Sequence, residues 1–129
     1  LSTMKNFVAR VKKNKAITLE FISTQIKKGK KIFLYGASTK GNTVLQYYGL
    51  NNKKIPYAAE RTPFKWGKYT IGTGIKIISE KEAKKLKPDF FFVTPWGFIK
   101  EFIKREKKWL NNGGRFILPF PKMKIIRGK

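Results

Sequence analysis

The chain has 129 residues, of which 41% are hydrophobic and 15% aromatic, and this composition predicts one folded domain rather than a disordered polypeptide. It contains no cysteine and no histidine, which excludes disulfides, thiolate metal sites, thiol catalysis and the commonest general base and zinc ligand. The formal charge is +23, but the cations are mainly lysines in scattered pairs, so we interpret them as solvated faces and keep a nucleic-acid-binding surface as the less favoured alternative.

The first segment, residues 2–28, predicts one long helix or two abutting helices, ending at Gly29. Because it is basic and amphipathic, binding to a membrane surface is an alternative, although we favour packing on its own or another domain. We divide the chain into this lead-in, 1–28, and a domain over 29–129. No signal peptide is present, and no apolar run approaches the roughly 20 residues of a membrane span, so we expect a cytoplasmic location. The apolar positions at helical spacing are Met4, Phe7, Val8, Val11, Leu19, Ile22 and Ile26.

From Gly29 onward, short apolar runs alternate with helical patterns. The run 90–93 is apolar on both faces, which is typical of a central parallel strand, and we prefer this interpretation to an aromatic platform for bases. The alternation predicts an α/β, Rossmann-like three-layer sandwich around a mostly parallel sheet of about five strands, with an order beginning 3-2-1-4. Strands are expected at 31–35, 55–60, 75–78, 90–93 and 115–118, and helices at 42–48, from the Ser79 capping box to about 87, and at 98–110.

The loop after the first expected strand carries the most informative motif. Gly36, Ser38 and Gly41 have the spacing of the dinucleotide fingerprint G-x-G-x-x-G, and Glu60 ends the next strand, 24 residues after Gly36. An autonomous NAD(P)-binding module with these four residues on the cofactor is therefore an alternative. Serine at the second position disfavours it, because glycine there lets the backbone approach a pyrophosphate. Lys40 precedes the second glycine instead of following it, which excludes a P-loop nucleoside triphosphatase.

Several segments together form a composite pattern: Tyr-Gly-Ala-Ser-Thr-Lys-Gly-Asn-Thr at 35–43, Glu-Arg-Thr-Pro-Phe-Lys-Trp-Gly-Lys-Tyr-Thr at 60–70, Gly-Thr at 72–73, Ile-Lys-Ile at 75–77, Pro-Asp at 88–89, Trp-Gly-Phe at 96–98 and Gly-Arg-Phe-Ile-Leu-Pro at 114–119. In order and spacing, from about Gly29 to Pro121, this pattern resembles the C-terminal domain of S-adenosylmethionine-dependent sugar C-methyltransferases, which branch nucleotide-linked deoxysugars. It departs at Glu60, where the family pattern has aspartate, and at Gly97, where it has asparagine.

The resemblance implies a larger enzyme, in which a zinc module and an S-adenosylmethionine domain with the catalytic base precede this chain. There, a base would remove a proton beside the keto group of the sugar, and the enolate would attack the sulfonium methyl. The resemblance further implies that this chain has no catalytic or metal-binding residue and does not bind S-adenosylmethionine. It implies that the chain is inactive alone and helps the missing N-terminal methyltransferase domain to hold the nucleotide-sugar substrate.

Ligands of open α/β sheets bind beyond the carboxyl ends of the strands, and three segments with suitable groups map to that edge. Backbone amides at a helix start favour a phosphate, while an acid, cations, a phenol and an indole ring follow on the later loops. A plain strand-to-helix turn, a solvated Lys65 and a half-buried loop anchor at Trp96 are the alternative interpretations. The candidate substrate-binding residues are Gly36, Ala37, Ser38, Thr39, Lys40, Gly41, Asn42, Glu60, Arg61, Lys65, Tyr69 and Trp96.

Overall fold

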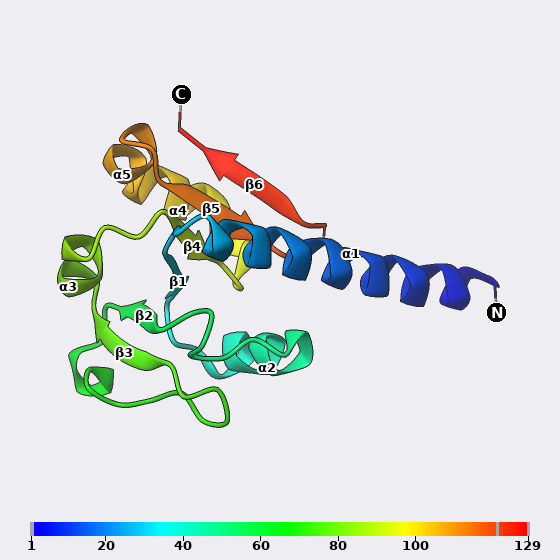
Figure 1. Cartoon of the computed structure of the whole chain (residues 1–129), viewed down its shortest axis with the longest axis horizontal. Coiled ribbons are helices and arrows are strands. Elements are labelled where there is room, and N and C mark those ends of the chain that lie inside the picture. The colour runs from blue at the N-terminus through cyan, green and yellow to red at the C-terminus, as the bar shows by residue number, and fades with distance from the viewer. Residues whose placement is uncertain (1, 121, 129) are drawn as a thin grey trace.

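The computed structural model describes residues 2–120 and 122–128, and strands alternate with helices along them (Figure 1). Helix α1 leads into the first strand as one continuous helix. The elements are α1 (Ser2–Lys27), β1 (Ile32–Tyr35), α2 (Thr39–Tyr48), β2 (Tyr57–Glu60), η1 (Pro63–Lys65), β3 (Lys76–Ser79), α3 (Glu80–Lys85), β4 (Phe90–Phe92), η2 (Trp96–Phe98), α4 (Ile99–Arg105), α5 (Lys107–Asn111), β5 (Arg115–Leu118) and β6 (Lys124–Arg127).

The six strands form one sheet in the order β3-β2-β1-β4-β5-β6. Neighbouring strands from β3 to β5 pair in parallel, whereas β5 and β6 pair antiparallel. The predicted α/β class, the mostly parallel sheet and the order beginning 3-2-1-4 are therefore confirmed. The prediction that 115–118 is the last strand is wrong, because β6 adds a sixth strand along the edge of β5.

Both faces of the central strands are buried, which gives the fold its three layers. Along β1, Ile32 and Leu34 pack in the core under α1 and α2, whereas Phe33 and Tyr35 pack in the core under α3, α4 and α5. The β4 side chains alternate in the same way, and all three phenylalanines are at most 2% exposed. Their rings are unavailable to bases, so the central-strand interpretation of residues 90–93 is confirmed and the stacking platform is excluded.

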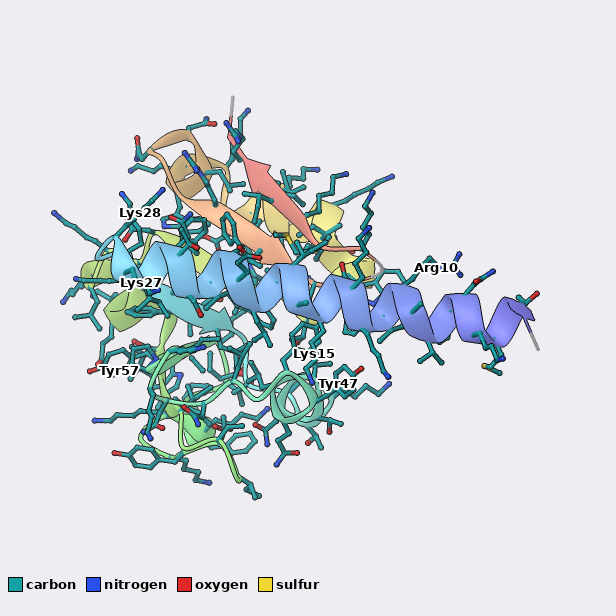
Figure 2. The ribbon with its side chains drawn as sticks, turned by 45° about the vertical axis from the view of Figure 1, so that its right-hand side comes forward. Arg10, Lys15, Lys27, Lys28, Tyr47 and Tyr57 are labelled. Atoms are coloured by element: carbon teal, nitrogen blue, oxygen red, sulfur yellow. The ribbon has the colours of Figure 1, made fainter. Side chains whose placement is uncertain are left out.

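The C-terminal half of α1 anchors that helix to the sheet. Thr18 and Ile22 are fully buried, and the Phe21 ring meets the Phe90 ring edge-on at 5.5 Å. On the neighbouring helix α2, the Tyr47 ring lies 4.6 Å from the Lys15 ammonium (Figure 2). Among the described residues, no helix combines the length and the apolarity that a membrane crossing requires.

The predicted continuous helix over 98–110 is wrong. The segment consists of η2, α4 and α5, and the two α-helices are separated at Glu106, whose backbone has φ −102° and ψ 23°. The apolar pattern suggested one helix, but the Glu106 side chain is drawn into the core, where it meets Tyr35. Helix α2 also begins three residues earlier than expected, because the Ser38 hydroxyl caps it by accepting a hydrogen bond from the Gly41 N–H.

Truncation of Phe92 to alanine tests how much the central strand β4 contributes to the stability of the domain. Phe92 is fully buried in β4, so Phe92→Ala should lower the free energy of unfolding by about 3–5 kcal/mol through lost burial and a residual cavity. Urea denaturation measures this loss. The control Phe64→Ala removes a ring that is 70% exposed and should change stability by no more than about 0.5 kcal/mol. Equal losses in the two variants would contradict the assignment of β4 to the core.

Candidate functional site

The loops after β1, β2 and β4 meet at the carboxyl edge of the sheet, where the strand order reverses between β1 and β4. Two cavities of about 530 Å³ each open there, and Ser38 and Pro95 form part of the wall of both. We call one the arginine cavity, since Arg61 and Arg105 line it. We call the other the aromatic cavity, because its lining includes Trp96, Phe98 and Phe120.

The loop from β1 to α2 presents backbone donors to this edge. Gly36 has φ +85°, a conformation that favours glycine and turns the chain out of β1. Among the described residues, the backbone N–H groups of Ser38, Thr39 and Lys40 make no hydrogen bond, and all three residues line the aromatic cavity. Free N–H groups and the helix dipole at such a start favour an anion, phosphate above all.

Gly41 allows α2 to pack tightly against the loop after β4. A Cβ atom at this position would lie 2.5 Å from the Thr94 hydroxyl oxygen and 2.9 Å from that of Ser38. The glycine that the fingerprint spacing singled out is therefore needed for this close approach. It keeps the start of α2 beside the Thr94 loop, where both segments line the aromatic cavity.

Glu60 braces the loops after β1 and β2. One carboxylate oxygen accepts the Ala37 N–H at 2.8 Å and the other accepts the Thr62 N–H at 3.0 Å. The Lys65 ammonium donates to the Ala37 carbonyl at 3.2 Å, which closes the same bridge. Burial alone would raise the pKa of Glu60, but these hydrogen bonds and the nearby Lys65 charge outweigh it and hold the pKa below its ordinary value.

Two residues of the dinucleotide-type loops have a structural role in the fold. Each Glu60 oxygen accepts one backbone N–H and keeps a second lone pair, so this carboxylate joins the two loops while it also lines the arginine cavity. The Ala37 N–H is used in the same brace.

The remaining candidate residues divide between the cavities and their surroundings. Lys65 reaches the loop through Ala37 without lining either cavity. Asn42 faces away from both cavities, since its side chain donates to the Ile71 carbonyl and accepts from the Thr73 hydroxyl. Tyr69 is 61% exposed outside them. The structure brings together, as cavity-lining candidates, Gly36, Ser38, Thr39, Lys40, Gly41, Glu60, Arg61 and Trp96.

The sequence did not predict a cluster around Tyr35 and Arg105, two residues that line the arginine cavity. The Tyr35 hydroxyl donates to Glu106 at 2.7 Å and accepts from the Arg105 Nε at 3.0 Å. Burial, followed by the Glu106 carboxylate, raises the pKa of Tyr35, which therefore stays protonated as a donor. Arg105 also reaches Glu80 at 3.3 Å. The only signal in the sequence was a single acid, Glu106, within the basic run 104–108.

Comparison with known proteins places this geometry in context. Residues 1–121 match a family described as the C-methyltransferase C-terminal domain. Over 122 residues the chain is 35% identical to the C-methyltransferase NovU of Streptomyces niveus. This alignment covers 95% of the chain and 29% of NovU. The chain therefore spans less than a third of the length of this relative.

Replacement of Glu60 by glutamine tests the brace. An amide cannot accept from both backbone N–H groups through two oxygens, so Glu60→Gln should lower the free energy of unfolding by about 1–3 kcal/mol at pH 7. Because the pKa of Glu60 is lowered in the folded state, its carboxylate contributes fully above its ordinary value of 4.5 and loses its contribution as the pH falls through the folded pKa. Urea denaturation of both proteins between pH 7 and pH 3 should show their difference shrinking below pH 4.5.

The exposed carboxylate of Glu20 provides the control for this experiment. Glu20→Gln removes a charge from the surface of α1 and should change stability by no more than about 0.5 kcal/mol at any of these pH values. A Glu60→Gln difference that stayed constant down to pH 3 would show that the ionised carboxylate does not brace the loops.

Proposed function

The chain belongs to the family of C-methyltransferase C-terminal domains, and on that premise we propose that it binds the nucleotide-linked keto-deoxysugar that such an enzyme methylates. The family assignment rests on a match over residues 1–121. The substrate class is our proposal, and it comes from the resemblance of the motifs together with the chemistry of the two cavities.

The observation that carries the proposal is the lining of the aromatic cavity. Ser38, Thr39 and Lys40, whose backbone N–H groups make no hydrogen bond among the described residues, line the same cavity as Trp96 and Phe98. A nucleoside diphosphate has two parts that suit these groups: phosphate oxygens that accept N–H bonds and a flat base that stacks on aromatic faces. The Lys40 ammonium adds a positive charge beside the same N–H groups.

The arginine cavity suits the sugar end of such a ligand. Its wall combines the Arg61 and Arg105 guanidinium groups with the Glu80 carboxylate and the Phe102 ring. Hydroxyl groups can both donate and accept, so they can pair with such a mixed set, while an apolar face of a sugar ring can rest on an aromatic side chain. The shared Ser38–Pro95 wall makes the two cavities adjacent, as one extended ligand requires.

We propose that methyl transfer itself needs a part of the enzyme outside this chain. S-adenosylmethionine would supply the methyl group in that part, while the residues described here would bind and orient the nucleotide sugar. Two observations support this division. The relative is more than three times as long as the matched segment, and the chain has no histidine or cysteine to act as a base or nucleophile. The isolated chain should therefore not methylate a sugar.

Truncation of Lys40 in the full-length enzyme tests the phosphate subsite. Lys40→Ala removes a charge-assisted contact, so the KM for the nucleotide sugar should rise about tenfold while the KM for S-adenosylmethionine stays unchanged. Steady-state kinetics with each substrate varied in turn measure both constants. Arg61→Ala, in the other cavity, should also raise the sugar KM.

Lys53→Ala is the matched control, because Lys53 is exposed in the turn before β2, at the opposite edge of the sheet. It removes the same charge and should leave both constants unchanged. Unaltered sugar KM values in both Lys40→Ala and Arg61→Ala, or methylation of a sugar by the isolated chain, would refute the proposed function.

A further inference from the structure

Helix α1 carries an apolar stripe that extends beyond the part of the helix that the sheet covers. Figure 1 shows the N-terminal half of α1 projecting past the other elements. Within the covered half, Thr18 and Ile22 are fully buried. Along the projecting half, residues 3–10 are all exposed. We call the apolar residues of this half, Met4, Phe7, Val8 and Val11, the projecting stripe.

The projecting stripe lies on the same face of the helix as the buried residues. At 3.6 residues per turn, positions 4, 7, 8 and 11 fall on the side that 18 and 22 occupy further along. Asn14 connects α1 to the rest of the domain at the base of this projecting half, since its amide donates to the Pro119 carbonyl after β5 at 2.5 Å and to the Tyr48 hydroxyl of α2 at 3.3 Å. Beyond it, Met4, Phe7 and Val8 remain 65%, 55% and 43% exposed.

Few interactions within the projecting half of α1 stabilise its helical conformation. Its first turn contains no acidic residue to complement the helix dipole. Isolated helices shorter than about 12–15 residues are marginal in water, and tertiary contacts supply most helix stability in proteins. A continuous apolar face without internal cover is therefore typical of a segment that packs against something else.

The charges beside the projecting stripe define the chemistry of what covers it. Lys5, Arg10 and Lys12 flank the stripe, and no carboxylate occurs before Glu20. Figure 2 shows Arg10 on this projecting part of the helix. A complementary surface is therefore an apolar groove with an acidic rim. A second copy of this helix would bring two strongly basic segments together, which like-charge repulsion opposes.

We propose that the projecting stripe docks into an apolar, acid-rimmed groove on the preceding methyltransferase part of the same polypeptide. This inference rests on the proposed function in one respect, namely that such a part precedes this domain. The matched family is a C-terminal domain, and the chain covers only 29% of its relative. The rest of the enzyme would then join at the N-terminal end of α1, where covalent linkage raises the local concentration of the groove.

Hydrogen exchange over residues 3–11 tests the docking. In the isolated chain these amides should exchange rapidly, because they lie in a helix segment without tertiary cover. In the full-length enzyme they should exchange at least tenfold more slowly. Phe7→Asp places a charge in the stripe and should restore rapid exchange in the full-length enzyme. The control Ala9→Asp places the same charge on the opposite, exposed side of the same turn and should leave the protection intact.

Three results would overturn the proposal. The first is equal exchange of residues 3–11 in the isolated chain and the full-length enzyme. The second is concentration-dependent protection of this segment with a doubled mass in sedimentation of the isolated chain, which would assign the stripe to a second copy. The third is protection only with vesicles containing phosphatidylserine. Sugar methylation by the full-length enzyme is measured separately. The docking proposal can therefore fail while the proposed function holds, and the proposed function can fail while the docking proposal holds.

Discussion

Strands β1 and β4 are apolar on both faces, and the rest of the domain depends on the need to cover both. Alternate side chains of β1 enter two different cores, so helices must lie on each side of the sheet. The parallel pairing of β3 to β5 brings the loops that follow these strands together at one edge of the sheet, at the carboxyl ends of the strands. The candidate ligand-binding groups lie on those loops, because β1 and β4 have no exposed face.

Three of the scarce carboxylates of this basic chain, Glu60, Asp89 and Glu106, act as internal hydrogen-bond acceptors between segments of the fold. Only seven are present among 129 residues. Glu60 joins the loops after β1 and β2, Asp89 accepts the Lys31 N–H at 2.8 Å where β1 begins, and Glu106 accepts the Tyr35 hydroxyl beneath the arginine cavity. An ionised acceptor makes stronger hydrogen bonds than a neutral one, so a few of them can fix several loops. Glu60 and Tyr35, the partner of Glu106, line the arginine cavity, whereas Asp89 lies where β1 begins, at the opposite edge of the sheet.

The position of the charge also separates two kinds of surface. The cavities at the carboxyl edge contain cations together with carboxylates and aromatic rings, an arrangement that suits a small polar ligand. The projecting half of α1 contains cations around an apolar stripe, an arrangement that suits a macromolecular surface. In our proposals, the first surface binds the substrate and the second docks on the rest of the enzyme.

Local patterns in the sequence determined the strand-helix alternation, the two-faced central strand, the helix cap at Ser79 and the motifs that mark the family, because each depends on neighbouring residues. Only the tertiary structure decided the features that join distant segments. Glu106 interrupts a periodic helix because its acceptor role involves Tyr35, 71 positions away. Strand β6 forms through its antiparallel pairing with the edge of β5. Its four residues could not be predicted as a strand, because so short a pattern does not specify a partner. Glu60 has the spacing of a ligand-binding acid, yet its burial against two backbone N–H groups makes it a brace, and spacing alone carries no information on burial.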